Sequence, residues 1–287
     1  MNLKYPYFIG IGGHRCGTTW FFENLKNINN LKSLSKETHF FSRHFDHGFN
    51  WYFNEITAKD LEQPFCEFST SYLYDYNAPK RIKKYFPKTK IIVILRNPIY
   101  RFYSHYKHEI YVGHNTLNDL KNSYIMNPSY FELGNYFPYL ERWLNFYSKD
   151  EICVILFDDI LDNSLAIFNK VQSFLGFDTL SQSNRLTSST KNISMIPKNR
   201  MSSYIHFSIK KILKNNFFLK NMFPQELRKT FKKKIEKKIL TQIPFNNDDF
   251  NFVKEKYLTD QMKINFEKLS LLIDRDLQDL WFRKHND

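Results

Sequence analysis

The stretch YFIGIGGHRCGTT, residues Tyr7–Thr19, decides the fold. Its apolar start is strand-like, three closely spaced glycines and one basic residue follow, and a helical pattern begins at Trp20. A strand, a glycine-rich turn and a helix in this order are typical of a phosphate-binding loop. Backbone N–H groups of such a turn point at an anion, and the helix dipole favours negative charge there. Glycine serves where the backbone bends sharply or comes close to a ligand.

The loop differs from the two best-known nucleotide motifs. Gly12 and Gly17 have the spacing of the nucleotide triphosphatase loop G-x-x-x-x-G-K-[ST], but Thr18 stands where that loop has lysine. The cation comes earlier, at Arg15. A dinucleotide-binding G-x-G-x-x-G starting at Gly10 also fails, because Arg15 occupies its third glycine position. The loop is therefore predicted to bind phosphate-like anions, and a tight turn without a ligand is the alternative.

The composition limits the class of protein. The chain has 287 residues, a formal net charge of +13 and 42% hydrophobic residues, enough for a real core. A basic surface recruits polyanions such as nucleic acid, anionic lipid, acidic glycans or a highly charged nucleotide. Cys16, Cys66 and Cys153 form no spacing motif, which argues against a disulfide framework or a zinc site. Without a signal-like N-terminus or an apolar run of 18 residues, we expect a soluble, cytoplasmic protein, and a peripheral contact with a membrane surface stays open.

Strands alternate with helices along the chain, which predicts an α/β fold with a P-loop-like central parallel sheet in a single domain. The clearest strand is Lys90–Leu95, a continuous apolar run typical of a strand buried on both faces. Further strands are expected at Phe65–Ser69 and Glu151–Phe157. Helices are expected at Pro79–Phe86, from Pro98 onward, around Tyr139–Phe146, at Asp162–Leu175 before Gly176, and as a pair within Asp248–Trp281. Residues 111–135 and 178–200 are expected to be irregular.

A second anion site is predicted at the end of the central strand. Arg96 follows this strand directly, and open α/β sheets bind ligands at that end. Ser104 comes eight residues later, about two helical turns on. An arginine fork and a hydroxyl suit a second phosphate group. The alternative is that Arg96 pairs with a carboxylate at the end of the sheet.

Two motifs together resemble the sulfotransferase family. Gly12-x-x-Arg15-x-Gly17-Thr18-Thr19 is similar to the 5′-phosphosulfate loop of these enzymes, and Arg96-Asn97-Pro98-x-x-Arg101-x-x-Ser104-x-Tyr106 to their 3′-phosphate motif. The segment Lys36–Phe41, with His47–Tyr52 after it, resembles the heparan sulfate sulfotransferases and their bacterial relatives. So does the ending Phe266–Trp281. The resemblance spans nearly the whole chain.

The resemblance implies a cofactor and a set of site residues. The cofactor is 3′-phosphoadenosine 5′-phosphosulfate (PAPS), released as adenosine 3′,5′-bisphosphate, and no metal is required. The acceptor is a hydroxyl or amine of a glycan, polysaccharide or glycolipid, with Glu37 as base, Arg15 stabilising the leaving phosphate and His39 as the rival base. The implied cofactor-binding residues are Gly12, Gly13, His14, Arg15, Cys16, Gly17, Thr18, Thr19, Arg96, Ser104, Lys198 and Arg200.

The sequence departs from this pattern at two points. Many glycan sulfotransferases have lysine where this chain has Arg15, and they often have lysine where it has Phe68. The Arg-Lys-Gly motif of the cytosolic small-molecule sulfotransferases is absent. The basic segment 203–240 has three interpretations, which stay open: a solvated helical face, a lid or acceptor surface for an anionic glycan, or a helix on a membrane surface.

Other functions remain as alternatives. A sulfotransferase for small-molecule or protein hydroxyls would use His39 as the base. A nucleotide kinase would need lysine at position 18 and a carboxylate for magnesium. A nucleic-acid-binding protein would explain the charge and the aromatic content, but not two anion motifs on consecutive α/β units, so no nucleic-acid partner is expected. His105 and His108 have the spacing of a metal pair without a matching third ligand.

Overall fold

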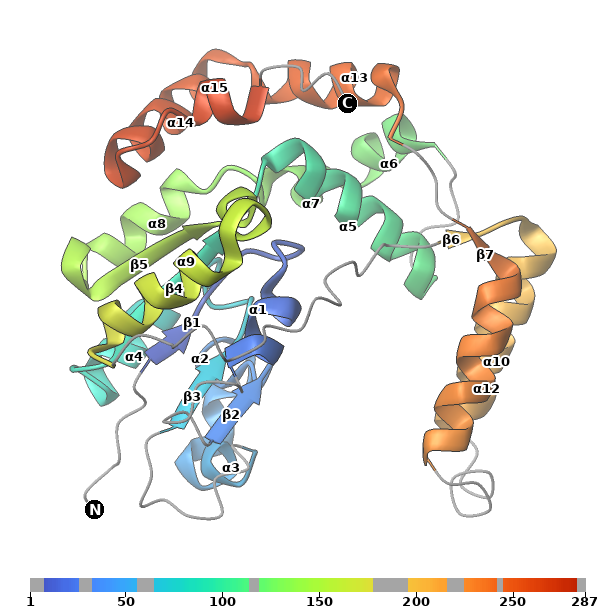
Figure 1. Ribbon diagram of the computed structural model, residues 1–287, viewed down its shortest axis with the longest axis horizontal. Coiled ribbons are helices and arrows are strands. Elements are labelled where there is room, and N and C mark those ends of the chain that lie inside the picture. Colours follow the sequence, from blue (N-terminus) through green and yellow to red (C-terminus); the bar gives the residue numbers. More distant parts are fainter. Residues whose placement is uncertain are drawn as a thin grey trace.

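Five parallel strands form the central sheet, in the order β2-β3-β1-β4-β5 (Figure 1). They are β1 (Phe8–Gly10), β2 (Ser33–Lys36), β3 (Phe65–Phe68), β4 (Lys90–Leu95) and β5 (Ile152–Leu156). The computed structural model describes residues 8–25, 33–55, 65–113, 119–177, 196–215, 225–241 and 245–282. The predicted α/β class with a central parallel sheet is confirmed.

Strand β4 is the core of this sheet, as its apolar run predicted. All five residues of Ile91–Leu95 are buried, and β4 pairs with β1 on one side and β5 on the other. Parallel strands buried on both faces need such continuous apolar sequences. The carboxyl ends of β1, β3 and β4 therefore lie side by side, and the polar segments that follow them are brought to the same edge.

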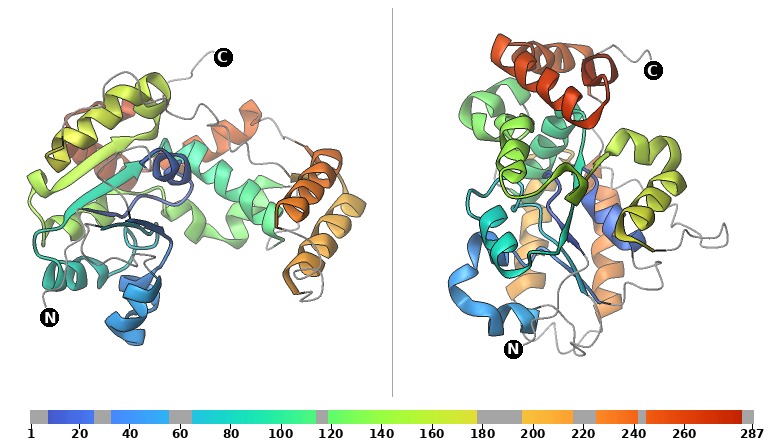
Figure 2. Two further views of the ribbon diagram at one scale, coloured as in Figure 1. Left: turned by 60° about the horizontal axis from the view of Figure 1, so that its bottom comes forward. Right: turned by 90° about the vertical axis from the view of Figure 1, so that its left-hand side faces the viewer.

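Helices cover both faces of the sheet (Figure 2). On one face, α1 (Thr18–Leu25) packs with α9 (Phe157–Leu175), where the rings of Phe21 and Phe168 stack at 5.1 Å. On the other face lie α4 (Ala78–Tyr85) and α8 (Phe137–Leu144). Four shorter elements lie between the sheet strands in sequence: α2 (Phe40–Arg43), α3 (Gly48–Glu55), and the 3-10 turns η1 (Phe45–His47) and η2 (Lys149–Glu151).

The segment 111–135 contains helices where irregular structure was expected. Helix α5 (Pro98–Val112) is followed by α6 (Leu120–Met126) and α7 (Pro128–Glu132). The starts of both later helices are marked by capping residues and not by a long periodic pattern of apolar residues. The Asp119 carboxylate accepts the backbone N–H of Lys121 at 2.9 Å at the start of α6, and Pro128 opens α7.

The C-terminal part forms three helices where two were expected. They are α13 (Asn247–Tyr257), α14 (Asp260–Ile273) and α15 (Leu277–Phe282), which lie across one end of the molecule (Figure 1). The extra break follows Ile273, where Asp274 adopts a left-handed φ of 54°. The backbone carbonyl of Trp281 accepts the side-chain amide of Asn97 at 2.7 Å, so these helices support the turn that follows β4.

The described residues of the basic segment 203–240, up to Ile239, fall on two neighbouring helices beyond the C-terminal end of α5, namely α10 (Arg200–Asn215) and α12 (Gln225–Ile239) (Figure 1). Its residues 216–224 lie outside the described part of the chain. An antiparallel pair of short strands, β6 (Ile196–Pro197) and β7 (Leu240–Thr241), lies at their base. The hydroxyl of Tyr111 on α5 donates to Glu236 on α12 at 2.9 Å. No helix in the described part of the chain has the length and apolar character to span a membrane.

Candidate active site

The predicted anion loop lies between β1 and α1. The N–H of Gly13 donates to the carbonyl of Ile94 at 2.9 Å, so the first half of the loop runs alongside β4. Gly17 adopts a left-handed φ of +79°, and a Cβ there would lie 2.2 Å from the ring of Phe157. Only glycine meets both conditions without displacing its neighbour. The backbone thus turns sharply at Gly17 and enters α1 with the helix N-terminus facing the cleft described below.

The two predicted anion motifs meet in space. The guanidinium Nε of Arg15, in the loop, donates to the hydroxyl of Ser104 on α5 at 3.3 Å. Arg96, at the end of β4, donates from Nη1 to the backbone carbonyl of Arg15 at 3.3 Å and lies over the ring of Phe157, 4.7 Å from its centroid. Burial and the nearby charge of Arg96 both lower the pKa of Arg15. The two arginines thus meet at one place, and a bound anion would stabilise their charges.

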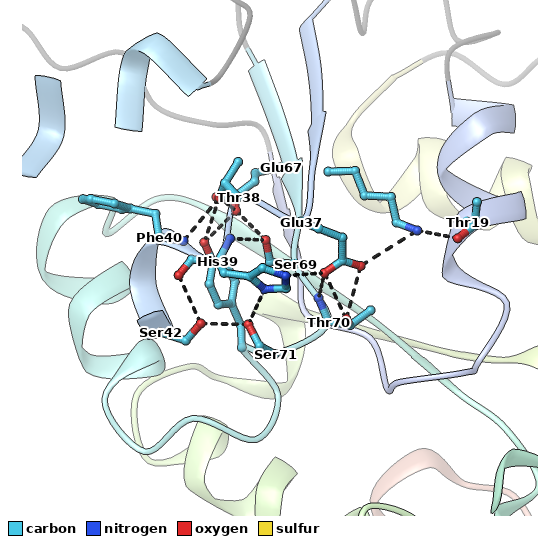
Figure 3. Close-up of polar contacts among 12 residues, drawn as sticks. Thr19, Glu37, Thr38, His39, Phe40, Ser42, Glu67, Ser69, Thr70 and Ser71 are labelled. Atoms are coloured by element: carbon cyan, nitrogen blue, oxygen red, sulfur yellow. Dashed lines mark hydrogen bonds and ion pairs between the residues drawn. The ribbon is translucent and has the colours of Figure 1, made fainter. Parts of the chain in front are cut away.

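Glu37 directly follows β2 and lines the same site as Arg15, Arg96 and Ser104. Figure 3 shows its polar contacts. Its carboxylate accepts the backbone N–H of Thr70 at 3.1 Å and the Thr70 hydroxyl at 3.0 Å. Lys36 Nζ lies 3.9 Å from Glu37 Oε1, and His39 Nε2 lies 3.4 Å from Glu37 Oε2. The side chain is 32% exposed, so a bound acceptor can reach it. Glu37 is therefore oriented by a loop that follows β3.

His39 is held on its other side by hydroxyl groups. Its Nδ1 lies 2.7 Å from the Ser71 hydroxyl, which in turn lies 2.7 Å from the Ser42 hydroxyl (Figure 3). The backbone N–H of His39 donates to Ser69 Oγ at 3.0 Å. Burial lowers the pKa of His39, with the charge of Glu37 opposing the shift. The imidazole is accordingly neutral at pH 7 and oriented at both ring nitrogens.

A buried carboxylate, Glu67 on β3, anchors the segment that carries both candidate bases. It accepts hydrogen bonds from the hydroxyls of Thr38, Tyr52 (2.7 Å), Ser69 (2.8 Å) and Tyr72 (2.6 Å). Burial raises the pKa of the Glu67 carboxyl group. Thr38 lies between two residues with left-handed φ angles of 59° and 54°, a backbone strained for side chains other than glycine. The hydrogen bonds to Glu67 hold this strained turn in place.

One cleft of about 950 Å³ is lined by Arg15, Lys36, Glu37, Thr70, Arg96 and Ser104. His39 and Glu67 are not among the described residues that line it. A volume near the upper end of ordinary ligand pockets leaves room for a nucleotide and part of an acceptor. The lining is strongly basic, with two carboxylates among its side chains. Its charged residues are Arg15, Lys36, Glu37, Arg43, Arg96, Lys107 and Glu109. Burial, with the charges of Arg96 and Arg15 adding to it, lowers the pKa of Lys107 to about 8.

The other predicted loop residues do not all face the cleft with their side chains. Thr18, Thr19 and His14 line it. Burial lowers the pKa of His14 to about 4, so its imidazole is neutral. Cys16 is fully buried, with its thiol toward the hydroxyl of Tyr136 at 3.7 Å. At Gly12, a Cβ would lie 2.9 Å from Thr18 Cγ2, so a side chain does not fit there and only the backbone can contact a ligand. The roles of these residues in cofactor binding stay predictions.

One predicted residue stands apart from the cleft. Lys198 is exposed next to β6, its backbone N–H donates to the carbonyl of Ile239 at 3.0 Å, and it is not among the described residues that line the cleft. The side chain of Arg200 lies outside the described residues. His105 lies 3.5 Å from the carboxylate of Glu109, and burial lowers its pKa to about 2. Within the described ranges, no group of three or more His, Cys, Asp or Glu side chains could hold a metal ion.

Sequence reasoning missed several groups of this site. Thr70 holds Glu37 from a loop 33 residues away, and Glu67 holds Thr38 from 29 residues away. The only sequence feature that pointed to these two contacts was the run of serines and threonines after β3. Lys36 stands beside Glu37 in the sequence and could have been noted from that position alone. Lys107, one helical turn after Ser104, could have been found by extending the face of α5.

An anion loop, an arginine at a strand end and a carboxylate across a basic cleft are typical of α/β enzymes that transfer a group from an anionic donor. The particular family follows from comparison with known proteins. Residues 8–242 match the sulfotransferase domain family, and the chain belongs to that family. The predicted resemblance is confirmed.

Two mouse proteins whose names refer to heparan sulfate are similar in sequence to this chain. Heparan sulfate glucosamine 3-O-sulfotransferase 6 of Mus musculus is 28% identical over 181 residues, covering 60% of this chain and 53% of the relative. The bifunctional heparan sulfate N-deacetylase/N-sulfotransferase 4 of Mus musculus is 28% identical over 196 residues, covering 60% of this chain and 22% of the relative. The chain thus spans about half the length of the first relative and less of the second.

A solved structure has the same fold over nearly the whole chain. The sulfotransferase from Alicyclobacillus acidocaldarius superposes with a TM-score of 0.68, covering 97% of this chain and 99% of the other, at 19% identity. At this level of identity the likeness establishes the fold.

Proposed function

We propose that this protein transfers a sulfuryl group from PAPS to a hydroxyl or amine of a carbohydrate acceptor, a glycan, polysaccharide or glycolipid. The observation that carries the proposal is the contact of Arg15 with Ser104, 3.3 Å between Nε and Oγ. This contact joins the loop after β1 to the helix after β4, in the cleft that also contains Glu37. The residues proposed to hold the two phosphates and the proposed base would thereby share one site.

The residues present fit PAPS. A nucleotide with a 3′-phosphate and a 5′-phosphosulfate needs two groups of cations and donors, and the cleft has them at the helix N-terminus and at the end of β4. Arg15, Thr18 and Thr19 would hold the 5′ end, and Arg96 and Ser104 the 3′-phosphate. The burial of Arg15 and its closeness to Arg96 lower its pKa, a cost that a bound polyanion would offset.

The proposal assigns a task to each of five residues. When bound, PAPS supplies an activated sulfuryl group with a stable anionic leaving group. Arg15 offsets the negative charge that develops at the 5′-phosphate. Glu37, fixed by Thr70, takes the proton of the acceptor hydroxyl or amine. His39 orients Glu37 through its Nε2 while Ser71 fixes its Nδ1.

The carbohydrate acceptor is supported by two independent features. The relatives at 28% identity carry names that refer to heparan sulfate. The net charge of +13 and the basic cleft suit an anionic glycan, because such charges raise its local concentration at the site. A small phenol or alcohol would gain little from this charge.

A transfer assay tests the proposal. The protein is incubated with PAPS carrying a labelled sulfuryl group and a panel of glycans, glycolipids and phenols. We expect label in a carbohydrate acceptor and stoichiometric release of adenosine 3′,5′-bisphosphate. Label only in phenols would overturn the acceptor class. If the protein bound neither PAPS nor adenosine 3′,5′-bisphosphate but turned over ATP with Mg²⁺, the proposal that PAPS is the donor would be wrong as well.

A further inference from the structure

Lys36, the last residue of β2, lies between the anion loop and the candidate base. Its Nζ donates to the hydroxyl of Thr19 in the first turn of α1 at 2.6 Å and lies 3.9 Å from Glu37 Oε1. Its side chain is only 18% exposed, and it lines the cleft. One ammonium thus contacts the element that would hold the donor and the carboxylate that would hold the acceptor.

A purely structural role does not explain this position. Glu37 already accepts two hydrogen bonds from Thr70, so it needs no ammonium at 3.9 Å. Thr19 is exposed, so its hydroxyl does not need a buried partner. Burial lowers the pKa of Lys36, which means that holding a charged lysine here is unfavourable. Ion pairs of this kind contribute little to stability.

On β3, the strand next to β2, the residue opposite Lys36 is not a cation. Strands β2 and β3 pair in parallel with Lys36 opposite Phe68. The ring of Phe68 is fully buried, packs against Phe21 and fills the space beside Gly10. A positive charge between Glu37 and the first turn of α1 is therefore supplied by β2.

We propose that Lys36 is a catalytic residue whose ammonium contacts the sulfuryl group during transfer. The role rests on the proposed function. As the acceptor oxygen or nitrogen bonds to sulfur, the bond from sulfur to the oxygen of the 5′-phosphate breaks. The acceptor proton passes to Glu37, and the electron pair stays on the phosphate oxygen. Lys36 and Arg15 offset the charge on the transferred group and on that oxygen, and Thr19 and Glu37 hold the ammonium when no ligand is bound.

Nucleotide binding without an acceptor provides a readout independent of turnover. PAPS and adenosine 3′,5′-bisphosphate differ by the sulfuryl group that Lys36 contacts. Lys36→Met should weaken PAPS about tenfold and adenosine 3′,5′-bisphosphate less than about twofold by calorimetry, the scale of one charge-assisted contact. Lys36→Arg should restore most of the difference. Lys84→Met, at an exposed site on α4, removes the same charge and should change neither affinity.

The rate gives the second readout. Lys36→Met should lower kcat about 10²-fold across the pH range, as expected for loss of a group that stabilises the transition state. If the loss disappears at higher pH, Lys36 only adjusts the proton affinity of Glu37 and the proposal is wrong. Equal weakening of both nucleotides, or an unchanged PAPS affinity, would also overturn it. A wild-type protein that binds neither nucleotide would remove the proposed function itself, and the role of Lys36 with it.

Discussion

His39 Nε2 and Glu37 Oε2 lie 3.4 Å apart, so the two rival bases form one pair. Both residues adopt left-handed backbone angles, and between them Thr38 is tied to the buried carboxylate of Glu67. Strain of this kind persists only where the surrounding structure enforces it, and it concentrates at functional sites. The choice between the bases is therefore a question of which member of the pair takes the proton.

His39→Ala should lower kcat about tenfold and leave KM nearly unchanged. The imidazole orients Glu37 but is neutral and held by Ser71, so its loss should loosen the base without removing it. Steady-state kinetics with PAPS and the acceptor found in the panel check this. Abolition of turnover with an intact fold would instead assign the proton transfer to His39.

Arg96→Ala should weaken the binding of adenosine 3′,5′-bisphosphate by about 2–3 kcal/mol, the scale of a hydrogen-bonded charge contact. Arg96 also holds the carbonyl of Arg15, so Arg96→Lys, which keeps the charge but not the fork, serves as the matched control. Calorimetry measures both. An unchanged affinity in Arg96→Ala would remove this residue from the 3′-phosphate site.

The affinity for adenosine 3′,5′-bisphosphate should fall as the pH rises through about 8. The pKa of Lys107 is lowered to about 8, chiefly by burial and further by Arg96 and Arg15, so its charge is lost in that range. A bound polyanion favours the charged form, and binding near this pH should therefore take up a proton. Titrations in buffers of different ionisation enthalpy detect the uptake. Lys107→Met should abolish it, and an uptake that persists in this variant would have another source.

Glu67→Ala should lower the free energy of unfolding by about 2–4 kcal/mol. The variant leaves the buried hydroxyls of Tyr52 and Tyr72 without their acceptor, and each such group costs about 1–3 kcal/mol. Urea unfolding measures the change, and Tyr52→Phe, which removes one donor only, should cost about 1 kcal/mol. A Glu67→Ala variant within about 0.5 kcal/mol of wild type would show that this network does not hold the turn.

The anion motifs could be predicted because their function needs fixed spacing within a few residues. The loop before α1 and the strand end at Arg96 each carry their signal locally. That Arg15 and Ser104 would touch follows from the pairing of β1 with β4, which local sequence does not contain. The roles of Thr70 and Glu67 depend on the pairing of β2 with β3, for the same reason.

Other features lay beyond sequence patterns for different physical reasons. The spacing that marks the anion loop does not distinguish a side chain facing the ligand from one facing the core, as the buried thiol of Cys16 shows. The short helices α6 and α7 are too brief for an apolar period, and only caps such as Asp119 mark them. The fold class could be predicted because strands alternate with helices along the chain and the apolar run of β4 marks a strand buried on both faces.

The most direct test compares wild type and Glu37→Gln with labelled PAPS and a carbohydrate acceptor. Gln is nearly isosteric and cannot take the proton, so the variant should bind adenosine 3′,5′-bisphosphate normally and transfer label about 10²–10⁴-fold more slowly. The loss should appear in kcat more than in KM. Near-normal transfer by Glu37→Gln, or no carbohydrate labelling by the wild type, would contradict the account.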